Sequence, residues 1–311
     1  MVITIITLLG WCGTVSAEDV VCDTFHYATN DGIELLLDRY AAGDSTEPRP
    51  CMIFAFGGGF VRGERNTPYY VNYFESLARE GIVVVSIDYR LGLKGFDGKG
   101  GVRAIEATLA RAVGIAVEDI YAATNYVIDN AAAWGVDTQK IMLSGSSAGA
   151  IASVQAEWLR CNGADAATVL PTDFRYAAVV SCAGAIFSTK GKPTFNDTPA
   201  PMLLFHGTSD NNVPYNKAAI MGTGFYGSKY IAKQLDRIDA PYMFYSVEYG
   251  DHQLAGTPLW DKCDLIKQFI RDYVTDGHRQ RTTINVENIG TERRKTRFTP
   301  MDYIRANYKR K

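Results

Sequence analysis

The sequence has little of what several classes of protein require. Its 311 residues include four histidines and six cysteines, and no two cysteines form a Cys-x-x-Cys pair, so zinc-ribbon and thioredoxin-type chemistry are not expected. No uninterrupted run of 18 apolar residues is present, so no transmembrane segment is predicted. Lys and Arg number 32 against 34 Asp and Glu, and this balance excludes a general nucleic-acid binder, which would be basic.

The composition is that of a globular protein, with 47% hydrophobic and 21% charged residues. Residues 18–278 are interpreted as one domain and residues 279–311 as a basic C-terminal extension. This extension has ten basic and three acidic residues, a net charge of +7, which leaves −9 for the remainder. Such an asymmetry indicates a separate element, either solvated or docked on the body, or an arm that contacts a partner, such as the second subunit of a homodimer.

The N-terminal segment has no charged side chain in residues 1–17 and ends in the small residues Val-Ser-Ala. This pattern predicts a signal peptide cleaved after Ala17, and hence a secreted or periplasmic protein; a buried N-terminal strand is the alternative. Cleavage would leave five cysteines, enough for at most two disulfides, and free thiols are the other interpretation. These five residues are Cys22, Cys51, Cys161, Cys182 and Cys263.

Short apolar runs alternate with longer stretches of helical periodicity. The runs are rich in Val, Ile, Leu and Phe, as in strands buried on both faces of a parallel sheet, and the alternation predicts crossover helices. The expected strands span 33–40, 51–56, 82–87, 140–143, 177–181, 202–205 and 242–247. The expected helices span 68–79, 101–130, 148–160, 227–238 and 258–274. The first two strands have no helix between them, so the sheet should begin antiparallel.

The strongest chemical signal is the sequence Gly-Ser-Ser-Ala-Gly at residues 145–149, which fits the pattern G-x-S-x-G. An apolar run precedes it and a helix of small residues follows it. A sharp strand-to-helix turn would place Ser147 in a strained conformation at the carboxyl end of the sheet, and small flanking residues would let neighbouring elements approach. The alternative is a serine that occurs by chance in a glycine-rich loop.

A second signal is the run of three glycines at residues 57–59, directly after a strand. Glycines let backbone N–H groups face a ligand, and two such donors can stabilise a tetrahedral oxyanion. The segment resembles the GGGFxxG loop of the cholinesterase and hormone-sensitive-lipase branches of the α/β-hydrolase superfamily. That resemblance implies that Gly58, Gly59 and Ala148 donate to the oxyanion. Phe56 stands where the family usually has His. The alternative, a phosphate-binding P-loop, lacks its GK[ST] sequence.

Two later loops resemble the acid and base loops of the same superfamily. Residues 206–214 match the pattern HGxxDxxVP, which implies that Asp210 is the acid and that His206 is structural. His252 follows the strand 242–247, where the superfamily has its base. His26 precedes the first long strand and His278 follows the last helix, so His252 is the strongest candidate base.

Three other carboxylates lie between the nucleophile and the end of the base loop. Asp251 adjoins His252, and side chains of adjacent residues in an extended loop point apart. Asp239 has the sequence context of a solvent-side turn. Glu248 ends a strand and is the main rival to Asp210 for the role of catalytic acid.

The order Ser147, Asp210, His252 matches the nucleophile–acid–base order of the superfamily. The resemblance covers residues 30–275 and implies an α/β-hydrolase fold: a mostly parallel, eight-stranded-type sheet flanked by helices, with antiparallel N-terminal strands. It implies a serine carboxylesterase of the acetyl esterase/lipase branch that uses no metal or organic cofactor. Asp88 and Arg90, after a strand as in the lipase branch, are expected to form a structural ion pair.

The substrate class is open at this point. Short-acyl esters, or acetyl and feruloyl esters of plant polysaccharide, are expected by analogy. One alternative function is a serine exopeptidase of the prolyl-oligopeptidase type, although this sequence has no room for the propeller of those enzymes. The other is an inactive, cholinesterase-like binding module, whose mark would be a missing triad residue. Candidate pocket walls are Phe60, Tyr69, Tyr70 and Ile186.

Overall fold

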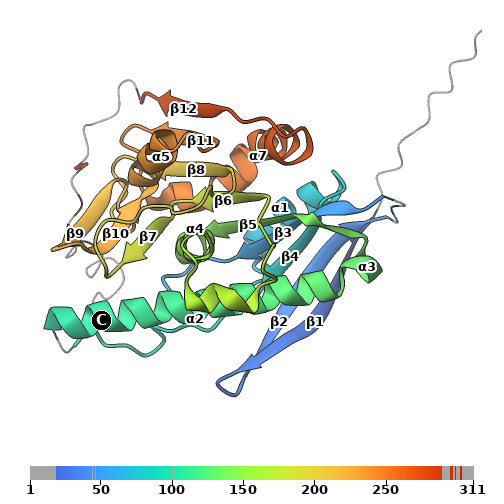
Figure 1. The fold of residues 1–311 in the computed structure, drawn as a ribbon, viewed down its shortest axis with the longest axis horizontal. Helices are drawn as coiled ribbons and strands as arrows, with labels where there is room; N and C mark the ends of the chain where they lie inside the picture. Colours follow the sequence, from blue (N-terminus) through green and yellow to red (C-terminus); the bar gives the residue numbers. More distant parts are fainter. Residues whose placement is uncertain are drawn as a thin grey trace, which may run out of the picture.

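The computed structural model describes residues 19–43, 45, 47–99, 101–288, 295, 296, 298 and 302, and a nine-stranded sheet runs through their centre (Figure 1). Its strand order is β1-β2-β4-β3-β5-β6-β8-β11-β12. From β4 to β12 every neighbouring pair is parallel, whereas β1–β2 and β2–β4 are antiparallel. The strands are β1 (Val20–Asn30), β2 (Ile33–Ala42), β3 (Arg49–Ala55), β4 (Val83–Ile87), β5 (Val136–Ser146), β6 (Ala178–Cys182), β8 (Met202–Gly207), β11 (Tyr242–Val247) and β12 (Arg281–Val286). The predicted fold class is thereby confirmed, with one strand more than expected.

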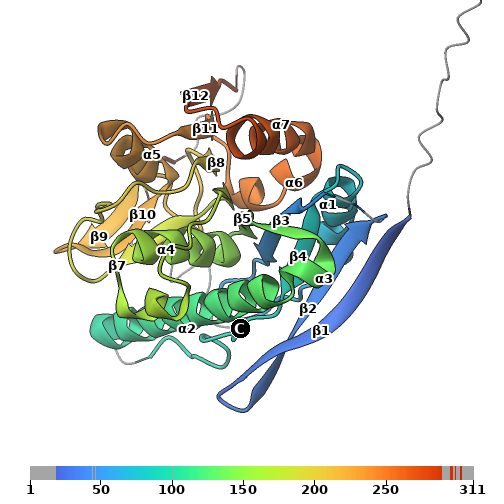
Figure 2. The same ribbon diagram turned by 45° about the vertical axis from the view of Figure 1, so that its right-hand side comes forward.

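Helices cover both faces of this sheet, because its central strands are apolar on both sides. All residues of β4, β6 and β8 are buried. Helices α2, α4 and α5 lie on one face, and α1, α6 and α7 lie on the other (Figure 2). Their bounds are α1 (Pro68–Ala78), α2 (Gly101–Asp129), α4 (Ala148–Cys161), α5 (Ser228–Arg237), α6 (Pro258–Asp261) and α7 (Cys263–Phe269), with the one-turn α3 (Ala131–Trp134) after α2. Within the described part of the chain, no helix is both long and apolar enough to cross a membrane.

The antiparallel edge of the sheet is a long hairpin of β1 and β2, of which only β2 was predicted from the sequence. Strand β1 was missed because few of its side chains are buried. Its turn residues, Asp31 and Gly32, both have positive φ, at 52° and 75°. Asp-Gly in that conformation is the preferred two-residue connection between antiparallel strands.

A small second sheet was also missed, because its strands have only four or five residues. Its order is β7 (Ala185–Ser188), β10 (Thr223–Gly227) and β9 (Lys217–Ile220).

At its other edge, the sheet extends beyond residue 278, where the domain was expected to end. Strand β12, which the sequence assigned to the C-terminal extension, pairs in parallel with β11 over its whole length. Backbone hydrogen bonds continue at both ends, from Tyr242 N–H to Gln280 O at 3.0 Å and from Glu248 N–H to Val286 O at 2.8 Å. Its alternating exposure suits an edge strand with one covered face. The sheet therefore continues eight residues into the basic segment, most of which lies outside the described residues.

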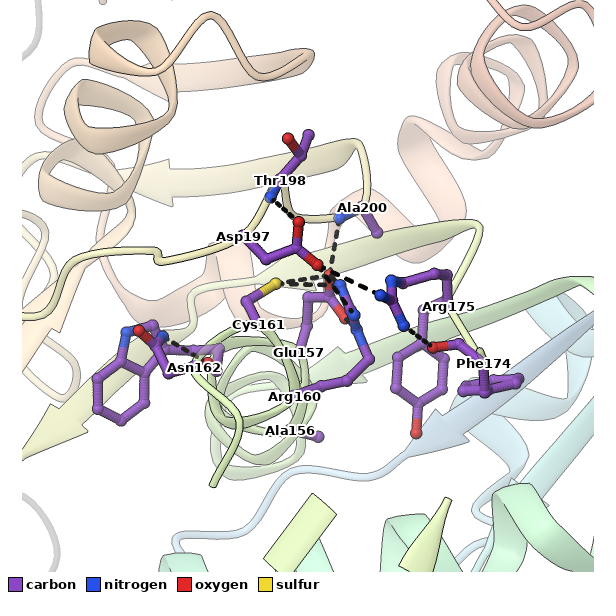
Figure 3. A network of polar contacts seen from close by, with 12 residues as sticks. Ala156, Glu157, Arg160, Cys161, Asn162, Phe174, Arg175, Asp197, Thr198 and Ala200 are labelled. Atoms are coloured by element: carbon purple, nitrogen blue, oxygen red, sulfur yellow. Dashed lines mark hydrogen bonds and ion pairs between the residues drawn. The ribbon is translucent and has the colours of Figure 1, made fainter. Parts of the chain in front are cut away.

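Helix α4 is anchored at its C-terminal end by a buried carboxylate (Figure 3). Glu157 accepts hydrogen bonds from the Arg160 guanidinium at 2.8 and 2.9 Å and from the Ala200 N–H at 2.7 Å. The Cys161 thiol is 3.2 Å from the same carboxylate. Half-exposed Asp197 lies 3.8 Å from Arg160. The network ties the helix to the segment that leads into β8, and it satisfies every oxygen of a fully buried charge.

The five cysteines on which the disulfide expectation depended are free thiols in the structure. Cys51, Cys161 and Cys182 are buried, Cys263 is partly buried and Cys22 is exposed. The free-thiol interpretation therefore describes this structure, although not all five thiols are buried. The expected signal peptide at residues 1–17 lies outside the described residues.

Candidate active site

The candidate nucleophile, Ser147, occupies a sharp turn between β5 and α4. Its φ and ψ angles are 50° and −113°, a region that a residue with a side chain adopts only when its surroundings enforce it. The Ser147 N–H donates to the Cys182 carbonyl at 2.9 Å. The turn thus directs the Ser147 side chain outward at the carboxyl end of the sheet.

The glycines of the G-x-S-x-G pattern are required by close backbone contacts. A Cβ at Gly145 would lie 2.4 Å from the carbonyl carbon of Gly149, and a Cβ at Gly149 would lie 2.0 Å from the Ala55 oxygen. Any side chain at either position would force β5, β3 and α4 apart. The structure thus has the close approach of neighbouring elements around the turn that the pattern predicted.

The three candidate triad residues meet in one chain of hydrogen bonds. The Ser147 hydroxyl oxygen is 2.8 Å from His252 Nε2, and His252 Nδ1 is 2.8 Å from Asp210 Oδ2. His252 opens the 3-10 turn η2 (His252–Ala255) after β11, and Asp210 follows β8. Because β5, β8 and β11 are parallel, their carboxyl ends meet at the same edge of the sheet. Ser147 and His252 are partly exposed, whereas Asp210 is buried.

Asp210 is held by its other oxygen and by a second imidazole. Oδ1 accepts the N–H groups of Asn212 and Val213 at 2.8 and 2.9 Å. Burial opposes ionisation of this carboxyl, but the imidazoles of His252 and His206 outweigh it and hold the pKa of Asp210 well below its usual range. The Asp210 carboxylate is therefore ionised and held in one orientation.

His206, which the sequence indicated to be structural, contacts the candidate acid directly. Its ring is fully buried, with Nε2 3.4 Å from Asp210 Oδ2 and 3.2 Å from the Val213 oxygen. Nδ1 is 2.8 Å from the Ser228 hydroxyl, at the start of α5. A Ser228 hydroxyl that donates to Nδ1 leaves the proton on Nε2, where it faces Asp210. The HGxxD spacing, which puts His and Asp four residues apart around one strand end, was the signal for this contact.

The rival acids and bases are used elsewhere. The Asp251 carboxylate accepts the Gln253 N–H at 3.0 Å and so caps the turn that begins with His252. Asp239 pairs with Arg281 at 2.7 Å. His26 lies on β1 and contacts Thr29. Glu248 continues the backbone pairing of β11 with β12. None of these four residues is in the chain of hydrogen bonds that joins Ser147 to Asp210.

The glycine loop lies directly beside Ser147. A Cβ at Gly57 would be 3.3 Å from the Ser147 Cβ. Gly58 and Gly59 have φ angles of 127° and 67°, and a Cβ at Gly58 would be 1.9 Å from the Arg62 oxygen. Among the described residues, the N–H groups of Gly58 and Gly59 have no acceptor. Ala148 is the first residue of α4, where an N–H has no partner within the helix.

Phe56, the departure from the family pattern, is accommodated by packing. Its ring stacks on Tyr89 at 4.4 Å between centroids, and the Tyr89 hydroxyl donates to the Phe56 oxygen at 2.8 Å. A Cβ at Gly63 would be 2.4 Å from the Phe56 ring. An aromatic pair therefore stabilises the base of the glycine loop. The Tyr70 hydroxyl, 3.3 Å from Gly57 N, supports the same loop.

One expected contact is wrong. Asp88 and Arg90 do not pair with each other: Asp88 binds Arg65 at 2.8 Å. Arg90 binds the fully buried Asp119 at 2.9 Å and Asp31 at 2.6 Å. Each side chain pairs with a different element: Asp88 with the loop before α1, and Arg90 with α2 and the turn between β1 and β2. These ion pairs fix the loop after β4, and none of them includes a triad residue.

A protein-family model described as BD-FAE matches residues 37–186, which include the glycine loop and Ser147. Over 115 residues the chain is 36% identical to Esterase B1 of Culex pipiens, covering 35% of this chain and 18% of that protein. It is 35% identical over 103 residues to the fumonisin B1 esterase of Sphingopyxis macrogoltabida, covering 33% and 18%. The chain thus spans less than a fifth of the length of these two curated relatives.

Among solved structures, Thermogutta terrifontis esterase 2 phosphoramylated by tabun superposes with a TM-score of 0.61. The alignment covers 81% of this chain and 94% of that chain at 22% identity. The sheet order and the serine turn define an α/β-hydrolase fold. The sequence relatives above are esterases, and the solved structure that superposes on this chain is an esterase as well.

Proposed function

We propose that this chain is a serine carboxylic-ester hydrolase. The observation that carries the proposal is the continuous arrangement of Ser147, His252 and Asp210, with 2.8 Å at each link, beside a loop of free backbone N–H groups. A hydroxyl nucleophile, a base and an orienting acid in this geometry are the machinery of acyl transfer. The esterases to which the chain is similar support the same chemistry.

In the proposed reaction, the Ser147 hydroxyl oxygen attacks the acyl carbon of the ester and transfers its proton to His252 Nε2. The C–O bond to the alcohol then breaks, and the alcohol leaves with the proton from His252. Water, deprotonated by the same imidazole, attacks the acyl-enzyme and releases the carboxylic acid. Asp210 keeps the Nδ1 proton of His252 in place and stabilises the imidazolium.

The N–H groups of Gly58, Gly59 and Ala148 are proposed to bind the oxyanion of each tetrahedral intermediate. A single donor of this kind contributes about 3–4 kcal/mol to catalysis in a serine hydrolase. The start of α4 adds the positive end of its dipole at Ala148. The strained backbone of Ser147 keeps nucleophile and donors in register without any movement during the reaction.

Short-acyl esters and acetyl or feruloyl esters of plant polysaccharide are the proposed substrates. The test is a panel of p-nitrophenyl acyl esters, acetylated xylo-oligomers, methyl ferulate and a proline amide, with purified Ser147→Ala as the blank. Hydrolysis of esters by the wild type alone supports the proposal. Turnover of the proline amide in preference to every ester would favour the exopeptidase alternative, and no turnover would favour a binding module.

We also propose that the protein is exported and that the leader is removed after Ala17. The charge-free N-terminal segment supports this, and N-terminal sequencing of exported protein should begin at Glu18. Mature cytoplasmic protein that retains Met1 would contradict it.

Association of two copies through the basic C-terminal segment is proposed from its charge of +7 opposite an acidic body. Light scattering of the full chain and of a chain ending at Asn288 tests this directly.

A further inference from the structure

Two large aromatic side chains are exposed on the same part of the surface. Tyr69 is 44% exposed and Trp260 is 61% exposed. Among the described residues, every other Phe, Tyr and Trp side chain is more buried than these two. Large apolar side chains that are exposed next to one another often mark a binding site.

The two residues come from helices on the same face of the sheet. Tyr69 is in the first turn of α1, Trp260 is in α6, and the two helices pack side by side (Figure 2). The Trp260 side chain interacts with the Tyr69 hydroxyl. Beneath that hydroxyl is Gly256, at which a Cβ would be 2.8 Å from the Tyr69 oxygen. The pair, called here the aromatic pair, is therefore held in place rather than free in solvent.

The aromatic pair is connected to both halves of the candidate active site. Tyr69 packs edge-on against Tyr70, with ring centroids 5.5 Å apart. The Tyr70 hydroxyl contacts Gly57 N, and Gly57 lies against Ser147. On the other side, α6 follows the turn that begins with His252, and Gly256 lies between them. A molecule whose acyl carbon is at Ser147 therefore has the aromatic pair at the edge of its binding site.

We propose that Tyr69 and Trp260 form a subsite that binds the flat, apolar face of a ring in the ester substrate. The inference rests on the proposed function, because it assigns the ring to the same molecule that Ser147 attacks. Indole and phenol rings provide large, rigid contact area at low entropic cost, and they stack on other rings. A phenolic ring and a pyranose ring both present such a face, and the experiment separates these two sources.

The kinetic test compares wild type, Trp260→Ala and Trp260→Phe on three esters. Methyl ferulate carries a phenolic ring, acetylated xylo-oligomers carry pyranose rings, and ethyl acetate carries no ring. For one of the two ring-bearing esters, Trp260→Ala should lower kcat/KM about tenfold, the effect of losing one stacked ring. Trp260→Phe should retain most of the activity, and ethyl acetate hydrolysis should be unchanged. Equal effects on all three esters, or none on either ring-bearing ester, would overturn the inference.

A binding measurement separates failure of the subsite from failure of the proposed function. Ser147→Ala is titrated with methyl ferulate and with xylo-oligomers, and binding is measured by calorimetry. The aromatic pair predicts saturable binding of one of them, weakened about tenfold when Tyr69→Ala or Trp260→Ala is added. Ile238→Ala, at a distant exposed residue, is the control and should leave binding unchanged. Binding that is unaffected by both aromatic substitutions, or no binding at all, would refute the subsite even if the wild type hydrolyses esters.

Discussion

Two buried carboxylates are linked to helix α4, one through His252 and the N-cap residue Ser147 and one within its last turns, and they have different partners. At the N-terminal end, Asp210 contacts the imidazoles of His252 and His206, and the chain of hydrogen bonds ends at the partly exposed Ser147. At the C-terminal end, Glu157 is enclosed by Arg160 and the Ala200 N–H (Figure 3). One charge is paired with groups that exchange protons, and the other with a guanidinium that never does.

The different partners suggest different roles: Asp210 should act in turnover, and Glu157 should act in stability. A carboxylate that meets an imidazole can stabilise a proton arriving from Ser147, so its loss should affect turnover. A carboxylate paired with a guanidinium can only hold segments together, so its loss should affect stability. Four substitutions or deletions test this division, in order of decreasing effect.

Asp210→Asn should lower kcat about 10⁴-fold while the protein stays folded, because the amide leaves His252 in the wrong tautomer. Kinetics on the preferred ester and a thermal melt of the same preparation measure both properties. Glu248→Gln and Asp251→Asn are matched controls that should cost far less. Near wild-type turnover in Asp210→Asn, with an inactive Glu248→Gln, would assign the acid to β11 instead.

Glu157→Gln should lower the free energy of unfolding by about 3–5 kcal/mol, since it leaves the buried Arg160 without its main counter-charge. Its kcat on any ester should be unchanged at a temperature where it is folded. The control is Asp197→Asn: this carboxylate is 50% exposed and 3.8 Å from Arg160, so its loss should cost under about 1 kcal/mol. Denaturant unfolding curves of the three proteins test the prediction, and a large loss of kcat in Glu157→Gln would break the division.

A chain that ends at Gly277 lacks β12 and should be less stable by about 2 kcal/mol, because β11 becomes an unpaired edge. A chain that ends at Asn288 retains β12 and is the matched control. Both should keep measurable turnover, because the triad lies on β5, β8 and β11. Equal melting temperatures for the two truncated chains would show that β12 contributes no stability to the sheet.

His206→Gln should lower kcat about tenfold, the value of one hydrogen bond to a charged group, about 1.4 kcal/mol. The matched control is Tyr215→Leu, which removes the ring that packs edge-on against the same imidazole at 5.7 Å and leaves the contact of His206 with Asp210 in place. Tyr215→Leu should lower stability without changing kcat. Identical kinetic losses in the two variants would mean that His206 acts only through packing.

The depressed pKa of Asp210 also predicts a pH dependence. A carboxyl whose folded pKa lies below its unfolded value of about 4 adds stability that is complete above that value and is lost as the pH falls through the lower folded pKa. Asp210→Asn removes this contribution. The difference in unfolding free energy between wild type and Asp210→Asn should therefore shrink below pH 4, measured by urea titration at pH 7 and pH 3. A difference that is constant with pH would contradict the assignment of charge.

The central parallel strands were predictable because each is a short apolar run that no helix period fits. The serine turn was predictable because Gly145 and Gly149 are required by its close contacts. Strands β1 and β12 were not, since exposed edge strands alternate with polar residues and resemble loops. Partners that depend on side-chain direction were also not predictable. The partners of Asp88 and Arg90 come from the turn between β1 and β2, from α2 and from the loop before α1, and the contact of His206 with Asp210 depends on the conformation of the loop after β8.

The most direct test of the account is covalent labelling of Ser147. Phenylmethylsulfonyl fluoride reacts with an activated serine hydroxyl and releases fluoride, and intact-mass measurement counts the adducts. We expect one adduct, mapped by peptide sequencing to Ser147, with much slower labelling in His252→Ala and none in Ser147→Ala. Stoichiometric labelling of a different residue, with Ser147 unmodified, would contradict the assignment of the nucleophile and with it the proposed function.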